Sequence, residues 1–340
     1  MDADGNSGAG RGGADVVAVV IPAYRAAGSV GAVVTAFRAV ADLVVVVDDG
    51  SDDATAAAAE AAGGANEGGG GPPVVVLRHP ANRGVGAATR TAIREALARG
   101  ADIVVKADAD GQMDAADLPD LVAPLRARAA DCAKGNRWYH GRALEAMPLV
   151  RRFGNLALGF LARAATGAWR VADPVNGYVA WRAEALDLID LDRAEDRYRF
   201  EISMLGLLTA AGGVVVDVPL PARYGGETSH LRPLREAPGF AWFLVRALYS
   251  RVWRQYFLHD ISAVSLFLVA GKLLSVFGVV FGAIEWRRSI VTGIPATAGT
   301  VLLAALPTLL GFNLLLQAAV LDIGRTPGVP LSRHRTKRRR

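Results

Sequence analysis

Two long apolar segments near the C-terminal end constrain the fold of this chain more than any other feature. Residues 261–281 contain a single charge, Lys272, and residues 296–321 contain none. A helix needs about 20 predominantly apolar residues to cross a bilayer, and Pro307 in the second segment is tolerated in a membrane helix. Two buried core helices are the alternative for a soluble protein. The lengths favour a hairpin of two membrane-spanning helices within residues 260–325.

Basic residues lie on the outer sides of this predicted hairpin. The last eight residues carry six lysines and arginines, and removing these six charges from the net charge of +5 leaves −1. A basic tail over 326–340 on a chain without a basic body weighs against nucleic-acid binding. By the positive-inside rule, we expect a cell-membrane protein whose N-terminal domain and both termini are cytoplasmic. The tail is interpreted either as an attraction to anionic lipid or as a topology signal alone.

The segment just before the hairpin alternates aromatic and aliphatic residues with arginines at helical spacing. Its sequence over 239–258 is GFAWFLVRALYSRVWRQYFL. This pattern is typical of an amphipathic helix that lies in the membrane interface, and we expect such a helix over 236–259. A helix packed into the core of a soluble domain is the alternative, because tryptophan and tyrosine also suit domain packing.

The N-terminal half of the chain alternates between apolar, β-branched runs and helical patterns. Residues 1–14 are rich in glycine, alanine and aspartate, and we predict that they are disordered. Strands are predicted at 16–24, 43–51, 74–80 and 101–110, and helices at 28–41, 52–62 and 86–100. This alternation indicates an α/β domain over 15–235, with a parallel sheet covered by helices. Ligands of such sheets collect at the carboxyl ends of the strands.

Acidic residues cluster at these predicted strand ends. Asp108 and Asp110 belong to the sequence VVKADADGQ, and residues i and i+2 of an extended segment point to the same side. Neighbouring carboxylates repel unless a cation lies between them, and Mg²⁺ or Mn²⁺ prefers carboxylate oxygens and keeps positions open for phosphate. An ordinary turn is the alternative, because aspartate and glycine are common turn residues. Tyr24, Asp48 and Asp49 also fall at strand ends, which favours a metal site at this edge.

Several motifs, in this order and at this spacing, resemble family 2 glycosyltransferases with a Rossmann-like GT-A fold. In the N-terminal half they are VVIPAY, VVVVDDGSDDAT, NRGVGAATRTAI and DADGQ. Downstream, KGNRWYH, MPLVRRFGN, DPVNGYVAW, RYRFEISML and VPLPARYGGETS resemble the membrane-anchored branch that contains dolichyl-phosphate mannose synthase and bacterial polyprenyl-phosphate glycosyltransferases. The resemblance covers roughly residues 16–325. It implies that a sugar is transferred from a nucleotide sugar to a polyprenyl phosphate, with inversion at the anomeric carbon and with Mg²⁺ or Mn²⁺ as cofactor.

The resemblance also implies roles for individual residues. Asp108, Asp110 and Gln112 would surround the metal, and Asp110 would be required for catalysis. The nucleotide pocket would be lined by Pro22, Ala23, Tyr24, Asp48 and Asp49. The residues expected near the diphosphate or the acceptor phosphate are Arg137, Arg151, Arg152, Asn155, Arg223 and Ser229. The chain departs from the family pattern at Asn136, where a serine is usual, and at His230, where a lysine is usual.

A lipid phosphate acceptor would explain why basic residues are expected beside an acidic metal site. A phosphate monoester has a second pKa of about 6, so at neutral pH it is largely ionised and barely needs a general base. It does need cationic side chains that bring two anionic substrates together, and arginine binds phosphate in a bidentate way. Asp173 could orient the acceptor or act as a base. Glu201 could be a charge on a helix surface or a residue of the site.

Three other functions are compatible with parts of the sequence. A processive family 2 synthase of cell-envelope polysaccharide is the closest, but the chain lacks a Gln-x-x-Arg-Trp motif and two helices cannot enclose a polymer pore. A nicotinamide-dependent oxidoreductase is suggested by GVGAATR at 84–90, although Thr89 stands in the place of the third glycine. The third is a non-catalytic membrane scaffold with a degenerate transferase domain, against which the intact Asp108, Asp110 and Gln112 argue.

Overall fold

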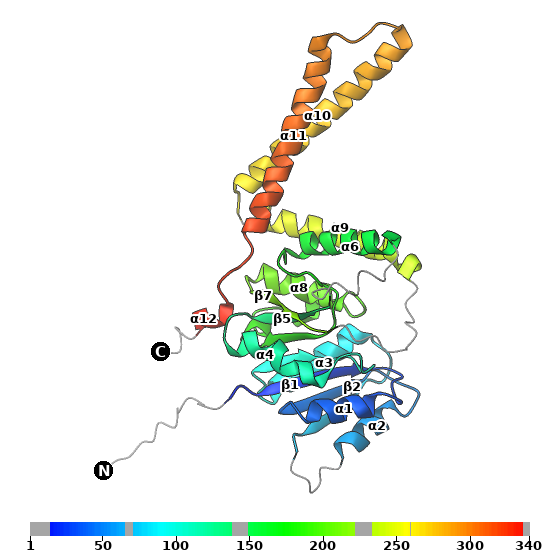
Figure 1. Ribbon diagram of the computed structural model, residues 1–340, viewed down its shortest axis with the longest axis vertical. Coiled ribbons are helices and arrows are strands. Elements are labelled where there is room, and N and C mark those ends of the chain that lie inside the picture. Colours follow the sequence, from blue (N-terminus) through cyan, green and yellow to red (C-terminus); the bar gives the residue numbers. More distant parts are fainter. Residues whose placement is uncertain (1–13, 65–70, 138–148, 222–232, 259, 336–340) are drawn as a thin grey trace, which may run out of the picture. The chain divides into compact units, whose positions relative to one another are not determined.

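The computed structural model describes residues 14–64, 71–137, 149–221, 233–258 and 260–335 (Figure 1). Only residue 14 of the segment 1–14 is among them, so disorder of that segment stays a prediction. The chain divides into two compact units. The first consists of Met1–Met147, Asp173–Thr228 and Val329–Arg340, and the second of Pro148–Ala172 and Ser229–Gly328. The domain limits expected from the sequence also stay predictions.

A seven-stranded sheet lies at the centre of the first unit. Its order is β3-β2-β1-β4-β6-β5-β7. The strands are β1 (Val17–Ala23), β2 (Leu43–Asp48), β3 (Val74–Arg78), β4 (Ile103–Lys106), β5 (Cys132–Asn136), β6 (Val179–Arg182) and β7 (Val215–Pro219). Strands β3, β2, β1 and β4 are parallel to one another, whereas β6 runs antiparallel to both β4 and β5. The sheet is therefore mixed, which corrects the expectation of a parallel sheet.

The four strands expected from the sequence are confirmed because their composition is unambiguous. Every residue of β1 and β2 is buried, as expected for parallel strands that are covered on both faces. Strand β4 ends at Lys106, so the expected strand 101–110 was too long. Strands β5, β6 and β7 were not expected, because they have only four or five residues and include Lys134, Arg182 or Asp217.

Helices on the sheet position its carboxyl edge. In the first unit these include α1 (Val30–Arg38), α2 (Thr55–Gly63), α3 (Val85–Ala98), α4 (Leu118–Arg126) and α8 (Phe200–Ala210). Alternate residues of β1, namely Val17, Val19 and Ile21, join one hydrophobic core with α1 and α4, as the period of two in a strand requires. Helix α3 packs against β1 and β2. The expected α/β layering is confirmed.

Long helices make up most of the second unit. Helices α6 (Leu149–Thr166) and α9 (Pro233–Trp253) lie side by side, and α10 (Ala263–Thr292) packs along α11 (Ala298–Gly324) as a hairpin (Figure 1). Among the described helices, α10 and α11 are the two that are long and apolar enough to cross a membrane. Helix α10 continues past the expected end at 281, so Arg287 and Arg288 lie on the helix and not in a connecting segment.

The expected interfacial helix corresponds to α9 and a π-helical continuation over Arg254–Leu258. Trp242 and Tyr249 of α9 are 71% and 69% exposed. Arg251 is different, because its guanidinium bonds Asp322 of α11 at 2.9 and 2.7 Å. The Asp322 carboxylate also accepts hydrogen bonds from the Trp169 indole at 2.9 Å and from the Tyr256 hydroxyl. This polar cluster ties α9 to the C-terminal end of α11.

The residues that follow the hairpin return to the first unit. The side chain of Asp131 is fully buried just before β5. It accepts hydrogen bonds from the backbone N–H groups of Val214 at 2.9 Å, Leu331 at 2.8 Å and Ser332 at 3.1 Å. Leu331 and Ser332 begin α12 (Leu331–Arg335). The first part of the expected basic tail is thus held by Asp131, and residues 336–340 lie outside the described residues.

Candidate active site

A pocket of about 380 Å³ lies at the carboxyl ends of β1 and β2. Pro22, Ala23, Tyr24 and Asp49, which were all expected to contact a nucleotide, contribute to its wall. The remaining lining residues are Asn82, Gly84, Val85, Ala88, Arg197 and Tyr198. All six belong to the sequence motifs NRGVGAATRTAI and RYRFEISML, although the sequence alone assigns no site role to them. The pocket therefore joins two motifs that are more than 100 residues apart in the chain.

The two aspartates at the end of β2 are held by backbone groups. Asp49 is 2% exposed, and its carboxylate accepts hydrogen bonds from the N–H groups of Arg83 at 3.0 Å and Gly84 at 2.7 Å. The ring of His79 bonds the same carboxylate at 2.7 Å. Asp48 is 5% exposed and accepts a hydrogen bond from the Ser51 N–H at 3.1 Å. Both side chains shape the loops around the pocket, and direct contact with a nucleotide stays a prediction.

The acidic motif forms a turn beyond the end of β4. Asp108 follows the strand in a loop, and Ala109 and Asp110 form a turn that Gly111 continues with φ of +77°. The Asp110 side chain accepts a hydrogen bond from the Gln112 N–H at 3.0 Å, and both residues are exposed. The extended geometry used to pair Asp108 with Asp110 was therefore wrong. The turn that was its alternative is the observed conformation.

These residues fit a divalent cation that is also held by phosphate. Within the described residues, no group of three or more His, Cys, Asp or Glu side chains could hold a metal ion. Asp108, Asp110 and Gln112 offer oxygen donors, which are the ligands that Mg²⁺ prefers. Magnesium is commonly bound by one or two carboxylates together with substrate phosphates and water. The donor set thus suits a cation that arrives with a diphosphate, and a metal role for these residues stays a prediction.

A buried lysine joins Asp108 to Glu201. Lys106, the last residue of β4, has a side chain that is 1% exposed, and its ammonium contacts the Asp108 carboxylate and lies 3.1 Å from Glu201 Oε1. Burial by itself lowers the pKa of Lys106, but the two carboxylates outweigh it and the pKa is raised. A Cβ on Gly177 would lie 2.6 Å from Asp108 Oδ2, so a larger residue there would require the Asp108 side chain to move. Glu201 therefore lies with Asp108 and not on a solvent-facing helix surface.

A second polar cluster lies around Asp173. Its side chain is fully buried and bonds the Arg137 guanidinium, whose Nε lies 2.9 Å from Asp173 Oδ2. Nearby, the Lys134 ammonium donates a hydrogen bond to the Asn176 carbonyl at 2.7 Å. Burial lowers the pKa of Lys134. The pairing with Arg137 favours an orienting role for Asp173 over that of a solvent-accessible base.

The other residues expected near an acceptor phosphate are not placed at this site. Arg151, Arg152 and Asn155 belong to α6 of the second unit, and their side chains are outside the description. Arg223 and Ser229 lie outside the described residues. Their expected roles stay predictions.

The glycines of the GVGAATR motif allow close contact between two segments of protein backbone. A Cβ on Gly84, whose φ is +102°, would lie 2.4 Å from the Asp196 carbonyl, and one on Gly86 would lie 2.1 Å from the Glu195 carbonyl. The N–H groups of Gly86 and Ala87 donate to the Asp196 carbonyl at 2.8 and 3.2 Å. In a dinucleotide-binding loop these groups would face a pyrophosphate. Their engagement by protein argues against the oxidoreductase alternative.

Comparison with solved structures supports the fold. Mannosyl-3-phosphoglycerate synthase from Rubrobacter xylanophilus superimposes with a TM-score of 0.52 and 20% identity, over 73% of this chain and 77% of that protein. This likeness shows the Rossmann-like GT-A fold alone.

Sequence relatives match part of the chain. An uncharacterised protein of Methanocaldococcus jannaschii is 35% identical over 149 residues, which are 44% of this chain and 61% of the relative. The UDP-N-acetylglucosamine–dolichyl-phosphate N-acetylglucosaminyltransferase of Methanococcus voltae is 33% identical over 36% of this chain and 48% of its own length. The undecaprenyl-phosphate mannosyltransferase of Micrococcus luteus is 33% identical over 43% and 59%. The matches thus span about half to three fifths of each relative.

The family model described as Glycosyl transferase family 2 matches residues 18–189, which contain all of β1 except Val17, the strands β2 to β6, the acidic turn and Asp173. The match covers half of the chain, and the pocket and acidic turn lie at the carboxyl edge of the sheet that it describes. This chain belongs to glycosyl transferase family 2.

Proposed function

We propose that this protein transfers a sugar from a nucleotide-diphosphate sugar to a polyprenyl phosphate at the cytoplasmic face of the membrane. The observation that carries the proposal is the combination, in one chain, of a family 2 catalytic fold with two helices of membrane-spanning length. The names of two relatives, from Methanococcus voltae and Micrococcus luteus, refer to lipid-phosphate acceptors, which supports the same substrate class. A lipid acceptor would also explain why the chain has membrane-spanning helices, because the acceptor phosphate lies at the membrane–water interface.

The proposed reaction is a single displacement at the anomeric carbon. The acceptor phosphate oxygen forms a bond to this carbon while the bond to the nucleoside diphosphate breaks, so the configuration inverts. Because the acceptor phosphate is already ionised at neutral pH, no side chain has to remove a proton. Asp173, which is buried and paired with Arg137, and Glu201, which is paired with Lys106, are therefore proposed to position other groups.

The pocket is proposed to hold the nucleoside diphosphate, with the acidic turn beside the diphosphate. Asp108, Asp110 and Gln112 would hold Mg²⁺ or Mn²⁺, which supplies positive charge to the leaving diphosphate. Arg137 is proposed to face the diphosphate or the acceptor phosphate. The same role is proposed for Arg151, Arg152, Asn155, Arg223 and Ser229. Arginines suit this task because they bring two anions together through bidentate hydrogen bonds.

The membrane elements are proposed to hold this site at the lipid surface. Helices α10 and α11 would span the bilayer, and α9 would lie in its interface with Trp242 and Tyr249 exposed. Because Leu331 and Ser332 are bonded to Asp131 of the first unit, the C-terminal end of α11 is connected by only a few residues to the catalytic unit. A hairpin that crosses the bilayer twice has both ends on one side, and this is the proposed topology.

The proposal is tested with the full chain purified in detergent. Release of nucleoside diphosphate should require polyprenyl phosphate, a sugar nucleotide and Mg²⁺ or Mn²⁺ together, and a panel of sugar nucleotides identifies the donor. Asp110→Asn should remove turnover, whereas Asp120→Asn, the same change at an exposed position on α4, should not. Normal turnover of Asp110→Asn would refute the metal role of the acidic turn. Release that does not depend on the lipid would refute the acceptor.

A further inference from the structure

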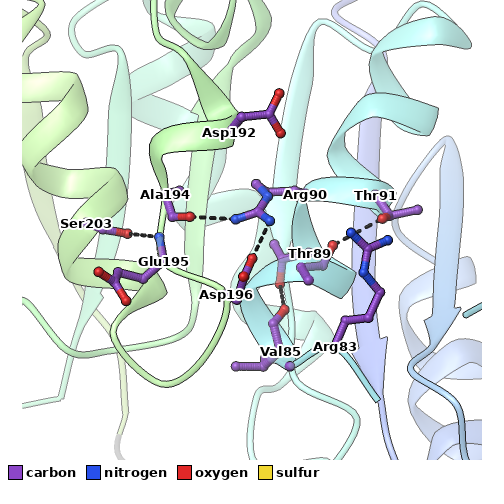
Figure 2. A network of polar contacts seen from close by, with 12 residues as sticks. Arg83, Val85, Thr89, Arg90, Thr91, Asp192, Ala194, Glu195, Asp196 and Ser203 are labelled. Carbon is purple, nitrogen blue, oxygen red and sulfur yellow. Dashed lines mark hydrogen bonds and ion pairs between the residues drawn. The ribbon is translucent and has the colours of Figure 1, made fainter. Parts of the chain in front are cut away.

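Residues 192–198, which we call the strap, cross the N-terminal part of α3 before α8 begins (Figure 2). Arg90 of α3 holds this segment. It is 8% exposed, its NH1 donates a hydrogen bond to the Ala194 carbonyl at 2.5 Å, and its NH2 contacts the Asp196 carboxylate. The Glu195 N–H also donates to the Ser203 hydroxyl at 2.9 Å. The strap is thus fixed both to α3 and to the first turn of α8.

The strap could not lie in this position if α3 began with ordinary side chains. The absence of a Cβ at Gly84 and Gly86 allows the carbonyls of Glu195 and Asp196 to approach the backbone of α3. The buried Arg90 then adds a charged anchor one turn further along the helix. The glycines and the arginine of one motif, GVGAATR, therefore act together to seat one segment.

The seated strap brings two side chains to the pocket wall. Arg197 and Tyr198 line the same pocket as Tyr24 and Asn82. The stem of Arg197 lies against Gly84, because a Cβ there would be 2.8 Å from Arg197 Cγ. Both side chains are exposed, and the Tyr198 side chain is 69% exposed. Tyr198 presents a ring and Arg197 a cation to whatever occupies this pocket.

We propose that the strap is a donor-binding element, in which Arg197 contacts the diphosphate of the nucleotide donor and Arg90 is the positioning residue that holds the strap. The inference rests on the proposed function, because it takes the pocket to bind a nucleoside diphosphate. A guanidinium forms stronger, charge-assisted hydrogen bonds with phosphate than neutral donors do. It also offsets the negative charge that the acidic turn and the donor share. The Tyr198 ring supplies apolar surface to the nucleoside.

Calorimetry with the full chain in detergent separates the diphosphate contact from general effects on the pocket. The probes are UDP, GDP and ADP, each with MnCl₂, and the corresponding nucleosides. Arg197→Gln should weaken binding of the preferred diphosphate by about tenfold or more, the loss expected for a charge-assisted hydrogen bond. Binding of the nucleoside should change less than about twofold. Arg126→Gln removes the same charge from an exposed position on α4, outside both the pocket and the strap, and should leave both affinities unchanged.

Arg90→Gln tests the positioning role. It should weaken diphosphate binding, and the loss in the double variant with Arg197→Gln should be smaller than the sum of the two single losses, because both changes remove the Arg197 contact. Hydrogen exchange of 192–198 should accelerate in Arg90→Gln but not in Arg197→Gln. Additive losses in the double variant would refute the positioning role. If Arg90→Gln folds poorly, the diphosphate affinity of Arg197→Gln still tests the proposal, because Arg197 is exposed and its substitution should leave the fold intact.

The outcomes also separate this inference from the proposed function. If Arg197→Gln binds diphosphate like the wild type while lipid-dependent transfer is normal, the inference is wrong and the function stands. If Arg197→Gln loses diphosphate affinity but no lipid phosphate accepts sugar, the acceptor is wrong and the strap role stands. Equal losses for nucleoside and diphosphate would also overturn the inference. A wild-type protein that binds none of the diphosphates would overturn both.

Discussion

Two lysines that are buried in the described part of the catalytic unit should respond very differently to the same substitution. Lys106 and Lys134 both have side chains that are 1% exposed. Lys106 lies between the carboxylates of Asp108 and Glu201, whereas Lys134 donates to a backbone carbonyl. Methionine is similar in length and removes the charge. The pair Lys106→Met and Lys134→Met therefore isolates the contribution of the carboxylate contacts.

The structure gives an expected magnitude for each variant. Lys106→Met leaves two carboxylates facing each other, and breaking a buried ion pair costs about 3–5 kcal/mol. Because the Asp108 side chain is 34% exposed and Glu201 13%, we expect the low end, about 3 kcal/mol. Lys134→Met loses one hydrogen bond but also removes a buried charge that has no carboxylate partner among the described residues. We expect its effect on the free energy of unfolding to stay within about 1 kcal/mol.

The single cysteine provides the assay. Cys132 is buried in β5 of the same unit, and burial raises the pKa of its thiol to about 12. Pulse labelling of this thiol in increasing urea reports unfolding of the catalytic unit of the full chain in detergent, independently of the membrane helices. A cost of about 3 kcal/mol corresponds to a fall in the urea midpoint of roughly 1–3 M, because the unfolding free energy falls by about 1–3 kcal/mol per M of urea. Equal destabilisation by the two variants would refute the stabilising role of the carboxylate–lysine cluster.

Three features of the packing lead to further predictions. Burial lowers the pKa of Lys134 below its ordinary value of 10.5, so between the folded and unfolded pKa values the unfolded state binds more protons. The urea midpoint of the wild type should therefore rise with pH in that window. In Lys134→Met the urea midpoint should show no such rise. Asp131→Ala removes the acceptor for the first N–H groups of α12 and should lower the free energy of unfolding by about 1–3 kcal/mol. Trypsin should then cleave at the C-terminal arginines faster than in the wild type. Cleavage at the wild-type rate would contradict the role of Asp131 in holding α12. Gly86→Ala should abolish folding, because its Cβ would lie 2.1 Å from the Glu195 carbonyl. Gly28→Ala, whose Cβ would have nothing within 4 Å, should be tolerated. A folded Gly86→Ala protein would contradict the close approach of the strap to α3.

The elements that the sequence predicts well are those whose composition has one interpretation. The runs of valine in β1 and β2 fit only buried strands, and the apolar lengths of α10 and α11 exceed those of ordinary core helices. The ends of these elements are predicted less well, because the residues that end an apolar pattern need not end a helix. Helix α10 continues through Arg287 and Arg288 for this reason.

The site could be predicted only where one motif supplies several neighbouring residues. The acidic residues and Pro22 to Tyr24 were singled out in this way, and they lie at the sheet edge that parallel topology indicates, while their roles stay predictions. Lys106 was missed because a charged residue at the end of a strand usually faces solvent, and its burial depends on Glu201, which lies almost 100 residues away. Arg197 was missed because its place in the pocket depends on the glycines of a distant helix.

The most direct test of the proposed activity is the identity of its product. The full chain in detergent is incubated with a radiolabelled sugar nucleotide, Mn²⁺ and undecaprenyl or dolichyl phosphate, and the organic extract is analysed by mass spectrometry. The proposed function predicts a polyprenyl phosphate whose mass has increased by one sugar residue, in an amount equal to the nucleoside diphosphate released. Diphosphate release with the lipid recovered unmodified, or a label found only in a water-soluble or polymeric product, would contradict it.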